Sequence, residues 1–372
     1  MTKTVAVVYS GARVWGGIET YLADLFRYAD PQTVRLLLVS MGEWDLNRAG
    51  IPAGAQRRLS PRRARPRTVL DIRGILKKER VDLVVSQGAV ANAYARVAAL
   101  FAGVPSLVVT HSVIATDYPA VLKRVAFTVA DRLLRPVTTR HVVVSRYLKD
   151  ELIRSGVRAD RITVVYNGVD IECGSGGPGS SSGLHVDGGA RLPGGARALS
   201  VVSVGRLHAV KSFDVLIRAM KLLPDDIGLT IWGEGEERGG LEALIGSLGL
   251  DGRVRLPGRT ESIPQALEDA DVYVQSSRSE GFGLALVEAM LCGRPVVVAP
   301  CGSLPELVED GRTGLVAAAC TPDALAASIQ RVLRDGELAA RIACAGREVA
   351  RARFTIERWI EGTTAAFLEA CR

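Results

Sequence analysis

Residues 199–222 read LSVVSVGRLHAVKSFDVLIRAMKL, so that a short apolar run, a glycine turn and a helical pattern follow one another. The run 199–204 is rich in valine and has the length and composition of a β-strand. Apolar residues then recur every three or four positions over 213–222, which predicts a helix. This strand–turn–helix unit is typical of α/β proteins that are built on a parallel sheet.

The same unit recurs along the whole chain. Helical patterns such as 19–28, 69–79 and 324–333 lie between the strand-like runs. Because parallel strands need right-handed helical crossovers, the alternation predicts an α/β fold with two Rossmann-like domains. Ligands bind such sheets beyond the carboxyl ends of the strands, and we expect the site in a cleft between the domains. The predicted strands are 4–9, 34–40, 83–86, 106–110 and 140–144, and then 199–204, 229–232, 253–256, 272–275 and 295–299.

Glycine and serine dominate the segment between the two halves. Nine of the 22 residues from 174 to 195 are glycine, a composition typical of a flexible linker or a long solvated loop. We therefore predict an N-terminal domain, a linker, a C-terminal domain and a final helical segment. Their bounds are 1–170, 171–198, 199–353 and 354–372.

The composition is that of a globular protein, with 48% hydrophobic and 23% charged residues in a chain of 372. No apolar run reaches the ~18 residues of a membrane-spanning helix, and the N-terminus resembles a first strand rather than a signal peptide. The six cysteines form no Cys-x-x-Cys pair and no metal-ligand spacing with the four histidines. We therefore expect a cytoplasmic protein with neither a disulfide framework nor a metal site.

The net charge of +7 is unevenly distributed. Residues 1–168 hold 26 Lys and Arg against 13 Asp and Glu, whereas the remainder holds 21 against 27. The excess is concentrated over 57–80, where it would attract an anionic inner membrane face or acceptor; a solvated face is the alternative. No aromatic residues interleave these arginines, so we predict no nucleic-acid partner. The residues predicted to meet the membrane or acceptor are Arg57, Arg58, Arg62, Arg63, Arg65 and Arg67.

Residues 279–288 read SEGFGLALVE and place two carboxylates eight positions apart. The glycines on both sides of Phe282 allow a tight turn and the close approach of a ligand to the main chain. A helix then begins near Leu284, and its N-terminus is a natural anion site. A phosphate site flanked by two carboxylates that can bind hydroxyl groups would suit a nucleotide sugar. The simpler interpretation of the stretch is a buried turn before an amphipathic helix. The candidate residues here are Glu280, Gly281, Phe282, Gly283, Leu284 and Glu288.

Two cations, Arg206 and Lys211, follow the predicted strand 199–204 and precede a helix. Arginine supplies a rigid fork and lysine a point charge, so the pair can hold a diphosphate; two surface cations are the alternative. The chain has no Walker loop and no Gly-x-Gly-x-x-Gly after its first strand, which argues against ordinary dinucleotide binding. Gly16 and Gly17 precede a helix and either form a loop turn or let a phosphate approach the main chain.

Together these motifs resemble those of the retaining nucleotide-sugar glycosyltransferases of family 4, which have the GT-B fold. The match comprises Gly-Arg-Leu-x-x-x-Lys from Gly205 and Glu-Gly-Phe-Gly-x-x-x-x-Glu from Glu280. It extends to Gly-Gly-Ile-Glu at 16–19 and to residues 165–170 and 310–315, in the family's order. The late loop departs from the family's Gly-Gly-x-Pro-Glu because Ser303 replaces the second glycine, which argues against a phosphate role for that loop.

The resemblance implies that the N-terminal domain binds the acceptor, that the C-terminal domain binds the nucleotide sugar, and that the final helix returns to the N-terminal domain. It also implies a role for each matching residue. Arg206 and Lys211 would bind the donor diphosphate and stabilise the leaving group. Glu288 would hold the ribose hydroxyls and Glu280 the donor sugar, while His111, after the strand 106–110, would lie near the transferred sugar. The implied catalytic residues are thus His111, Arg206, Lys211 and Glu280, and further implied donor-binding residues are Gly16, Gly17, Gly258 and Arg259.

The resemblance also implies a reaction. A hexose would move, with retention of configuration, from a UDP- or GDP-sugar to a hydroxyl of a lipid-linked or saccharide acceptor in cell-surface polysaccharide or glycolipid assembly. Two cations would neutralise the diphosphate, so neither a metal ion nor another cofactor is implied. The alternatives are a nucleotide-sugar epimerase of the same fold, a pyridoxal-phosphate-dependent sugar phosphorylase, and a non-catalytic nucleotide-sugar-binding protein at the membrane surface.

Overall fold

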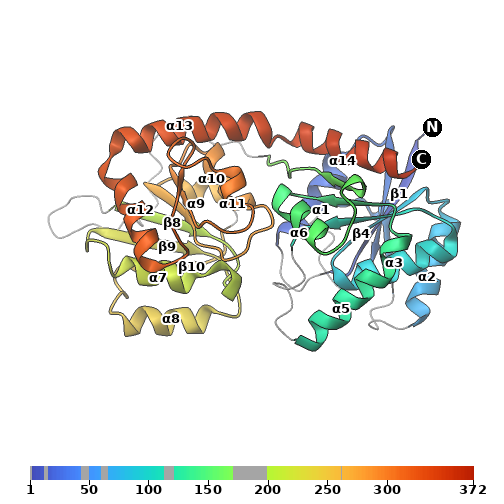
Figure 1. Cartoon of the computed structure of the whole chain (residues 1–372), viewed down its shortest axis with the longest axis horizontal. Coiled ribbons are helices and arrows are strands. Elements are labelled where there is room, and N and C mark those ends of the chain that lie inside the picture. The colour runs from blue at the N-terminus through green and yellow to red at the C-terminus, as the bar shows by residue number, and fades with distance from the viewer. Residues whose placement is uncertain are drawn as a thin grey trace. The chain divides into compact units, whose positions relative to one another are not determined.

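The structure, a computed structural model, describes residues 2–11, 16–42, 50–59, 66–112, 121–170, 199–260 and 262–372. They divide into two compact units, the first formed by Met1–Gly168 with Ile356–Arg372 and the second by Val169–Thr355 (Figure 1). Each unit has a parallel sheet with connecting helices, so the predicted α/β fold with two Rossmann-like domains is confirmed. The predicted linker 171–198 lies outside the described residues.

The first unit is built on a seven-stranded parallel sheet of order β3-β2-β1-β4-β5-β6-β7. Successive strands are added on one side of β1 and then on the other, so Val5 of β1 pairs with Leu36 on one side and Leu83 on the other. The strands are β1 (Lys3–Tyr9), β2 (Val34–Ser40), β3 (Gln56–Arg58), β4 (Leu83–Gln87), β5 (Ser106–Thr110), β6 (Arg140–Val143) and β7 (Ile162–Val164).

Helices cover both faces of this sheet because alternate side chains of its strands point to opposite sides. Val5 and Val7 join a core with α1 and α14, to which Trp359 of α14 belongs. Ala6 and Val8 join the opposite core with α2 and α3. The helices of this unit are α1 (Gly17–Tyr28), α2 (Pro66–Lys78), α3 (Ala89–Ala102), α5 (Val121–Leu134), α6 (Arg146–Arg154) and α14 (Ile356–Ala370).

The second unit has a six-stranded sheet of order β10-β9-β8-β11-β12-β13. Its strands are β8 (Leu199–Val204), β9 (Ile227–Trp232), β10 (Val254–Gly258), β11 (Val272–Gln275), β12 (Val296–Val298) and β13 (Leu315–Val316). The interior strands β8, β11 and β12 are largely buried on both faces, which explains their mostly apolar sequences. The helices are η4 (Ala209–Lys211, one 3-10 turn), α7 (Phe213–Met220), α8 (Arg238–Ser247), α9 (Ile263–Leu267), α10 (Leu284–Leu291), α11 (Leu304–Leu307), α12 (Pro322–Arg334) and α13 (Gly336–Arg353).

The cysteines correct one expectation. Cys292 is disulfide-bonded, although the cysteine spacing indicated no disulfide framework. Spacing along the chain does not show which thiols a fold brings within bonding distance. Among the described residues, Cys301, Cys320, Cys344 and Cys371 are free thiols.

Within the described ranges, no helix combines the length and apolar character needed to cross a membrane.

Candidate functional site

The two motifs predicted separately in the second unit meet at the carboxyl edge of its sheet. Lys211 ends η4 after β8, and Glu280 lies in the loop after β11. These are the neighbouring strands between which the order of the sheet reverses, the place where open α/β sheets bind ligands. Lys211 Nζ lies 2.6 Å from Glu280 Oε2, and the two side chains are only 23% and 14% exposed. The ion pair is therefore more shielded from water than an ordinary surface pair.

Glu280 is fixed by three hydrogen bonds to the same oxygen. Oε2 accepts from Lys211 Nζ at 2.6 Å, and from Gln275 Nε2 and Ser277 Oγ at 3.0 Å each. The buried Tyr273 hydroxyl donates in turn to Gln275 Oε1. Oε1 of Glu280 has no hydrogen-bond partner within the described residues. The carboxylate is therefore oriented in advance, with one oxygen held by the protein and the other open to a ligand.

Gln275 and Ser277 were not among the residues predicted from sequence. The available signal was the polar run Gln275-Ser276-Ser277 immediately after a buried strand. Polar side chains at the carboxyl end of a parallel strand point to a binding site, because that edge faces the ligand.

The second carboxylate of the motif, Glu288, lies on α10 near the same network. Burial raises the pKa of the Tyr273 phenol well above its ordinary value, and the charges of Glu280 and Glu288 raise it further. Both carboxylates therefore lie close enough to Tyr273 to act on it. The fold thus brings Lys211, Glu280 and Glu288 to one part of the second unit, near a tyrosine that the sequence prediction did not include.

The late loop supports the turn that carries Glu280. The main-chain N–H of Ser303 donates to the Glu280 carbonyl, and its hydroxyl donates to the Phe282 carbonyl, both at 3.0 Å. Gly302 has φ +60°, and a Cβ there would stand 2.4 Å from the Glu280 carbonyl oxygen. Gly283, with φ +92°, then starts α10. Ser303 therefore clamps the Glu280 turn, a role that the sequence did not indicate.

Arg206 lies in the loop after β8 and is exposed. Its side chain forms no ion pair within the described part of the chain.

The neighbouring loop after β9 approaches the segment 205–207 very closely. A Cβ at Gly233 would stand 1.8 Å from the Gly205 carbonyl oxygen, and one at Gly235 would stand 2.1 Å from that of Leu207. Only glycine fits these positions, and the signal that the sequence offered was Gly-Glu-Gly directly after the predicted strand 229–232.

Gly258 and Arg259 lie further along the same edge of the sheet. The Gly258 carbonyl accepts from the Gly233 N–H at 2.7 Å. Arg238 is the main cause of the lowered pKa of Glu234, and the charge of Arg259 contributes to it. The loops after β8, β9, β10 and β11 therefore form one row along the carboxyl edge of the second sheet.

In the first unit, Gly16 and Gly17 start α1 after β1, next to the reversal of that sheet. The carboxylate of Glu19 is buried and accepts from the Gly16 N–H at 2.9 Å and from the Tyr9 hydroxyl. Glu19 thus caps its own helix and fixes the position of Gly16. The Gly-Gly-Ile-Glu motif is in this respect a structural device that presents a helix N-terminus.

His111 follows β5 and lies among uncharged groups. Its Nε2 is 3.1 Å from Gln87 Oε1 at the end of β4, and the Tyr21 ring lies edge-on with ring centres 4.7 Å apart. Burial lowers the pKa of His111 to about 4, so the imidazole is neutral near pH 7. It is therefore a hydrogen-bonding group rather than a cation, and Gln87, which the prediction did not include, orients it.

The predicted basic cluster is partly neutralised. Arg57 is paired with Glu79 at 2.7 Å, and Arg35 is paired with the same carboxylate at 3.0 Å. The Arg57 hydrogen bonds are the main cause that lowers the pKa of Glu79. Arg58 and Arg67 are exposed, whereas three further members of the predicted cluster lie outside the described residues: Arg62, Arg63 and Arg65.

Two protein families match this chain. The family described as Glycosyltransferase Family 4 matches residues 15–173, and the one described as Glycosyl transferases group 1 matches residues 197–349. The first match lies in the first unit apart from its last residues, and the second lies in the second unit. The chain belongs to the group 1 glycosyltransferases. The resemblance to group 1 glycosyltransferases and the GT-B fold that it implied are thereby confirmed.

Similar proteins agree with this assignment. The glycosyltransferase is 36% identical over 181 residues to the D-inositol 3-phosphate glycosyltransferase of Mycolicibacterium gilvum, covering 46% of this chain and 39% of that protein. It is 34% identical over 170 residues to the lipopolysaccharide core biosynthesis glycosyltransferase LpsE of Rhizobium meliloti, covering 45% and 49%. The chain thus matches less than half the length of either relative. The crystal structure of Anabaena HepE in complex with UDP and glucose has the same fold, with a TM-score of 0.80, 24% identity and coverage of 98% and 99%.

Proposed function

We propose that this glycosyltransferase moves a hexose from a UDP-sugar to a hydroxyl acceptor, with retention of configuration and without a metal ion. The observation that carries the proposal is the shielded Lys211–Glu280 pair beside the exposed Arg206 at the reversal of the second sheet. UDP is preferred to GDP because solved structures of the same fold contain UDP and UDP-glucose.

The diphosphate lies against Arg206 and Lys211 in this proposal. These two cations stabilise the negative charge that develops on the β-phosphate as the sugar–phosphate bond breaks. Glu280 keeps Lys211 in place through Oε2 and offers Oε1 to a sugar hydroxyl. Glu288 accepts from the ribose hydroxyls, so that the two carboxylates hold the two ends of one donor molecule.

The transfer step needs no nucleophile from the protein. The bond between the sugar C1 and the β-phosphate oxygen breaks, and the acceptor oxygen bonds to C1 on the same face. The acceptor proton passes to the departing phosphate oxygen, so the products are the glycoside and UDP. His111 is neutral, held by Gln87, and hydrogen-bonds the transferred sugar without adding a charge.

Donor chemistry is tested first. A thermal-shift screen of UDP, GDP and ADP should show the largest stabilisation with UDP, because ligand binding stabilises the native state by mass action. UDP-sugars should then be hydrolysed slowly in the absence of acceptor. If none of the nucleotides raises the melting temperature, the proposed donor site is wrong.

Stereochemistry and metal dependence are tested next. The anomeric proton coupling in the product should match that of the donor sugar, and turnover should continue in excess EDTA. An inverted anomer would contradict the transfer step, and activity that EDTA abolishes and Mg²⁺ restores would contradict the role given to the two cations. Conversion of the donor to a different free sugar without acceptor would support an epimerase instead.

The acceptor that we propose is a lipid-linked saccharide of cell-surface polysaccharide or glycolipid assembly. It is motivated by the basic excess of the first half of the chain and by the relatives' names, which include a lipopolysaccharide core enzyme. Extracted lipid-linked oligosaccharides should accept label from a radioactive UDP-sugar. Transfer only to soluble sugars would contradict this acceptor class.

A further inference from the structure

Large hydrophobic side chains are exposed on one part of the first unit. Among the described residues, ten large hydrophobic side chains are exposed, and eight of them lie on α2, α3 and α5. The remaining two, Ile153 and Leu222, lie elsewhere. The eight that form this outer apolar face are Leu70, Leu100, Phe101, Val121, Leu122, Val125, Val129 and Leu133. Isolated exposed apolar residues need no explanation, but a group of this size on adjacent helices does.

Helix α5 is oriented with its apolar stripe outward. Leu122, Val125, Val129 and Leu133 follow one another at spacings of three and four residues, so they share one face. That face is exposed, with Leu122 83% and Leu133 74% accessible. A helix on the surface of a water-soluble domain normally presents the opposite face to the solvent.

A charged anchor holds α5 in this orientation. Asp131, from the inner side of α5, pairs with Arg96 of α3 at 2.9 Å, and the Arg96 side chain is only 2% exposed. Arg135 pairs with the same carboxylate at 3.1 Å. Breaking a buried charge pair is costly, so rotation of α5 to bury its apolar stripe would be strongly opposed.

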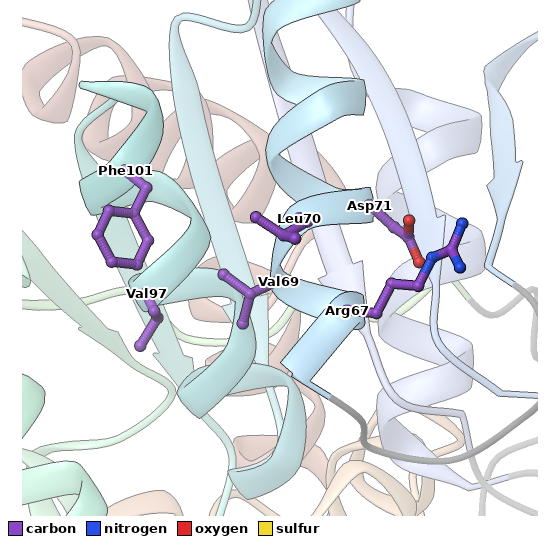
Figure 2. A pocket seen from close by; sticks show the side chains of 6 residues that line it. All are labelled: Arg67, Val69, Leu70, Asp71, Val97 and Phe101. Carbon is purple, nitrogen blue, oxygen red and sulfur yellow. The ribbon is translucent and has the colours of Figure 1, made fainter.

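The apolar face continues from α5 over α3 to α2, because α3 contacts both helices. An open groove of about 830 Å³ lies between α2 and α3. Figure 2 shows Phe101 and Val97 of α3 on one side of it and Leu70 and Val69 of α2 on the other. The groove therefore extends the apolar surface beyond the single stripe of α5.

The exposed charges on α2 and α5 are mainly basic. Asp71 is their single exposed acidic residue among the described side chains. Arg73 donates through Nε to the Phe101 carbonyl at 3.0 Å, which places a guanidinium beside the apolar face. Apolar side chains bordered by cations suit the boundary between the headgroups and acyl chains of an anionic bilayer. The exposed basic residues of these two helices are Arg67, Lys77, Lys78 and Arg132.

We propose that this outer face of α2, α3 and α5 inserts into the headgroup region of an anionic membrane. The inference deepens the proposed function, on which it rests for the lipid-linked acceptor that such a surface would bring near. It differs from attraction by the arginine cluster alone, because insertion of apolar side chains resists salt whereas exposed charges are screened.

The test is vesicle flotation without any donor. Wild-type protein should float with phosphatidylcholine–phosphatidylglycerol vesicles, and a substantial fraction should stay bound in high salt. Leu122→Glu combined with Leu133→Glu should lower the partition coefficient by about tenfold or more, because two exposed leucines lose their apolar contact with the lipid. The matched controls Ile153→Glu and Leu222→Glu, at exposed apolar positions elsewhere, should float like the wild type.

Three results would overturn the proposal: no flotation of the wild type, complete release by salt, or equal flotation of the double variant. Sedimentation velocity tests the alternative that the outer apolar face binds a second copy of this chain. If the wild type self-associates, the double variant is monomeric and neither binds vesicles, the face is a protein interface. UDP binding by the double variant is measured separately by thermal shift. It should equal UDP binding by the wild type, which would show that the variant is folded and that its donor site is intact. A failure of membrane binding can then be distinguished from a failure of the donor site.

Discussion

The two sheets of this glycosyltransferase reverse their strand order in the same way, but the side chains at the reversal are charged in one sheet and mainly neutral in the other. In the second unit, Lys211 and Glu280 form a shielded ion pair beside the exposed Arg206. In the first, His111 is neutral and faces Gln87, and the carboxylate of Glu19 is used to cap α1. The fold supplies two similar edges, and the loops decide which edge suits a charged ligand.

The difference agrees with the proposed division of the reaction between the units. A diphosphate needs cations, and the second unit holds one of them, Lys211, in place through Glu280 and its hydrogen bonds from Gln275 and Ser277. A sugar and an acceptor hydroxyl are neutral and need hydrogen bonds, which His111 can supply without an unfavourable charge.

The largest effect is expected from Lys211→Ala. Loss of one cation that stabilises a developing phosphate charge should lower kcat/KM for the donor by about 10²–10³-fold. The control is Arg278→Ala, an exposed cation 3.4 Å from Asp214, which should change kcat/KM by less than about threefold. If Lys211→Ala were as mild as the control, the charged edge would have no role in turnover.

The rigidity of the charged edge is tested by two glycines. Gly302 and Gly311 both have positive φ, +60° and +71°, so alanine costs about 1–2 kcal/mol at either position. At Gly302 the new Cβ would also meet the Glu280 carbonyl oxygen at 2.4 Å, whereas at Gly311 it would meet nothing within 4 Å. Gly302→Ala should therefore lose about 1–3 kcal/mol more of unfolding free energy in urea.

Donor turnover should also differ between Gly302→Ala and Gly311→Ala. Gly302→Ala should also lose donor turnover, because the clash displaces the turn that carries Glu280. Gly311→Ala should keep it once the protein is folded. Equal turnover in the two variants would show that the Glu280 turn tolerates displacement.

The first unit, which holds two neutral histidines, should lose stability in acid. Burial lowers the pKa of His141, on β6, to about 4, against about 6.5 in an unfolded chain. Below pH 6.5 the unfolded state gains a proton that the folded state does not. The unfolding free energy should therefore fall between pH 6.5 and pH 4, by up to about 3 kcal/mol from this residue.

Urea unfolding of the wild type and of His141→Gln at pH 7 and pH 5 measures this effect. The variant should lose less stability on acidification than the wild type. His111, whose pKa is also lowered to about 4, acts in the same direction, so His111→Gln should keep the slope that His141 causes. Identical acid slopes in His141→Gln and the wild type would contradict a buried neutral His141.

The smallest effect is expected from Gln275→Ala. It removes one of three hydrogen bonds to Glu280 Oε2 and frees the Tyr273 hydroxyl, which costs about 1 kcal/mol or about fivefold in kcat/KM. The double variant Gln275→Ala with Lys211→Ala should be no worse than Lys211→Ala alone if Gln275 acts by orienting Glu280 toward Lys211. Additive losses in that cycle would show an independent role for Gln275.

The long elements were predictable because each carries its own pattern. All ten strands predicted from sequence are present, with bounds that differ by at most two residues. The structure adds β3, β7 and β13, which are two or three residues long and lie at sheet edges. A segment of two or three residues is too short to show a periodic pattern. It becomes a strand because it can hydrogen-bond to the unpaired edge of the neighbouring strand.

The site was predictable in its residue types but not in its contacts. Lys211 and Glu280 were each identified from local motifs, yet they are 69 positions apart, and only the fold shows that one neutralises the other. Gln275 and Ser303 act through a hydrogen bond to a residue of another motif, which no local pattern encodes. Gly233 was missed for a related reason, since its conformation matters only because Gly205 lies against it.

Calorimetric titration of UDP and of uridine into the wild type and Lys211→Ala tests the central claim most directly. If the second unit binds the donor through its charged edge, Lys211→Ala should weaken UDP binding by about tenfold or more and leave the affinity for uridine unchanged. Equal affinity of the wild type and Lys211→Ala for UDP would contradict the account, because the diphosphate would then be held elsewhere.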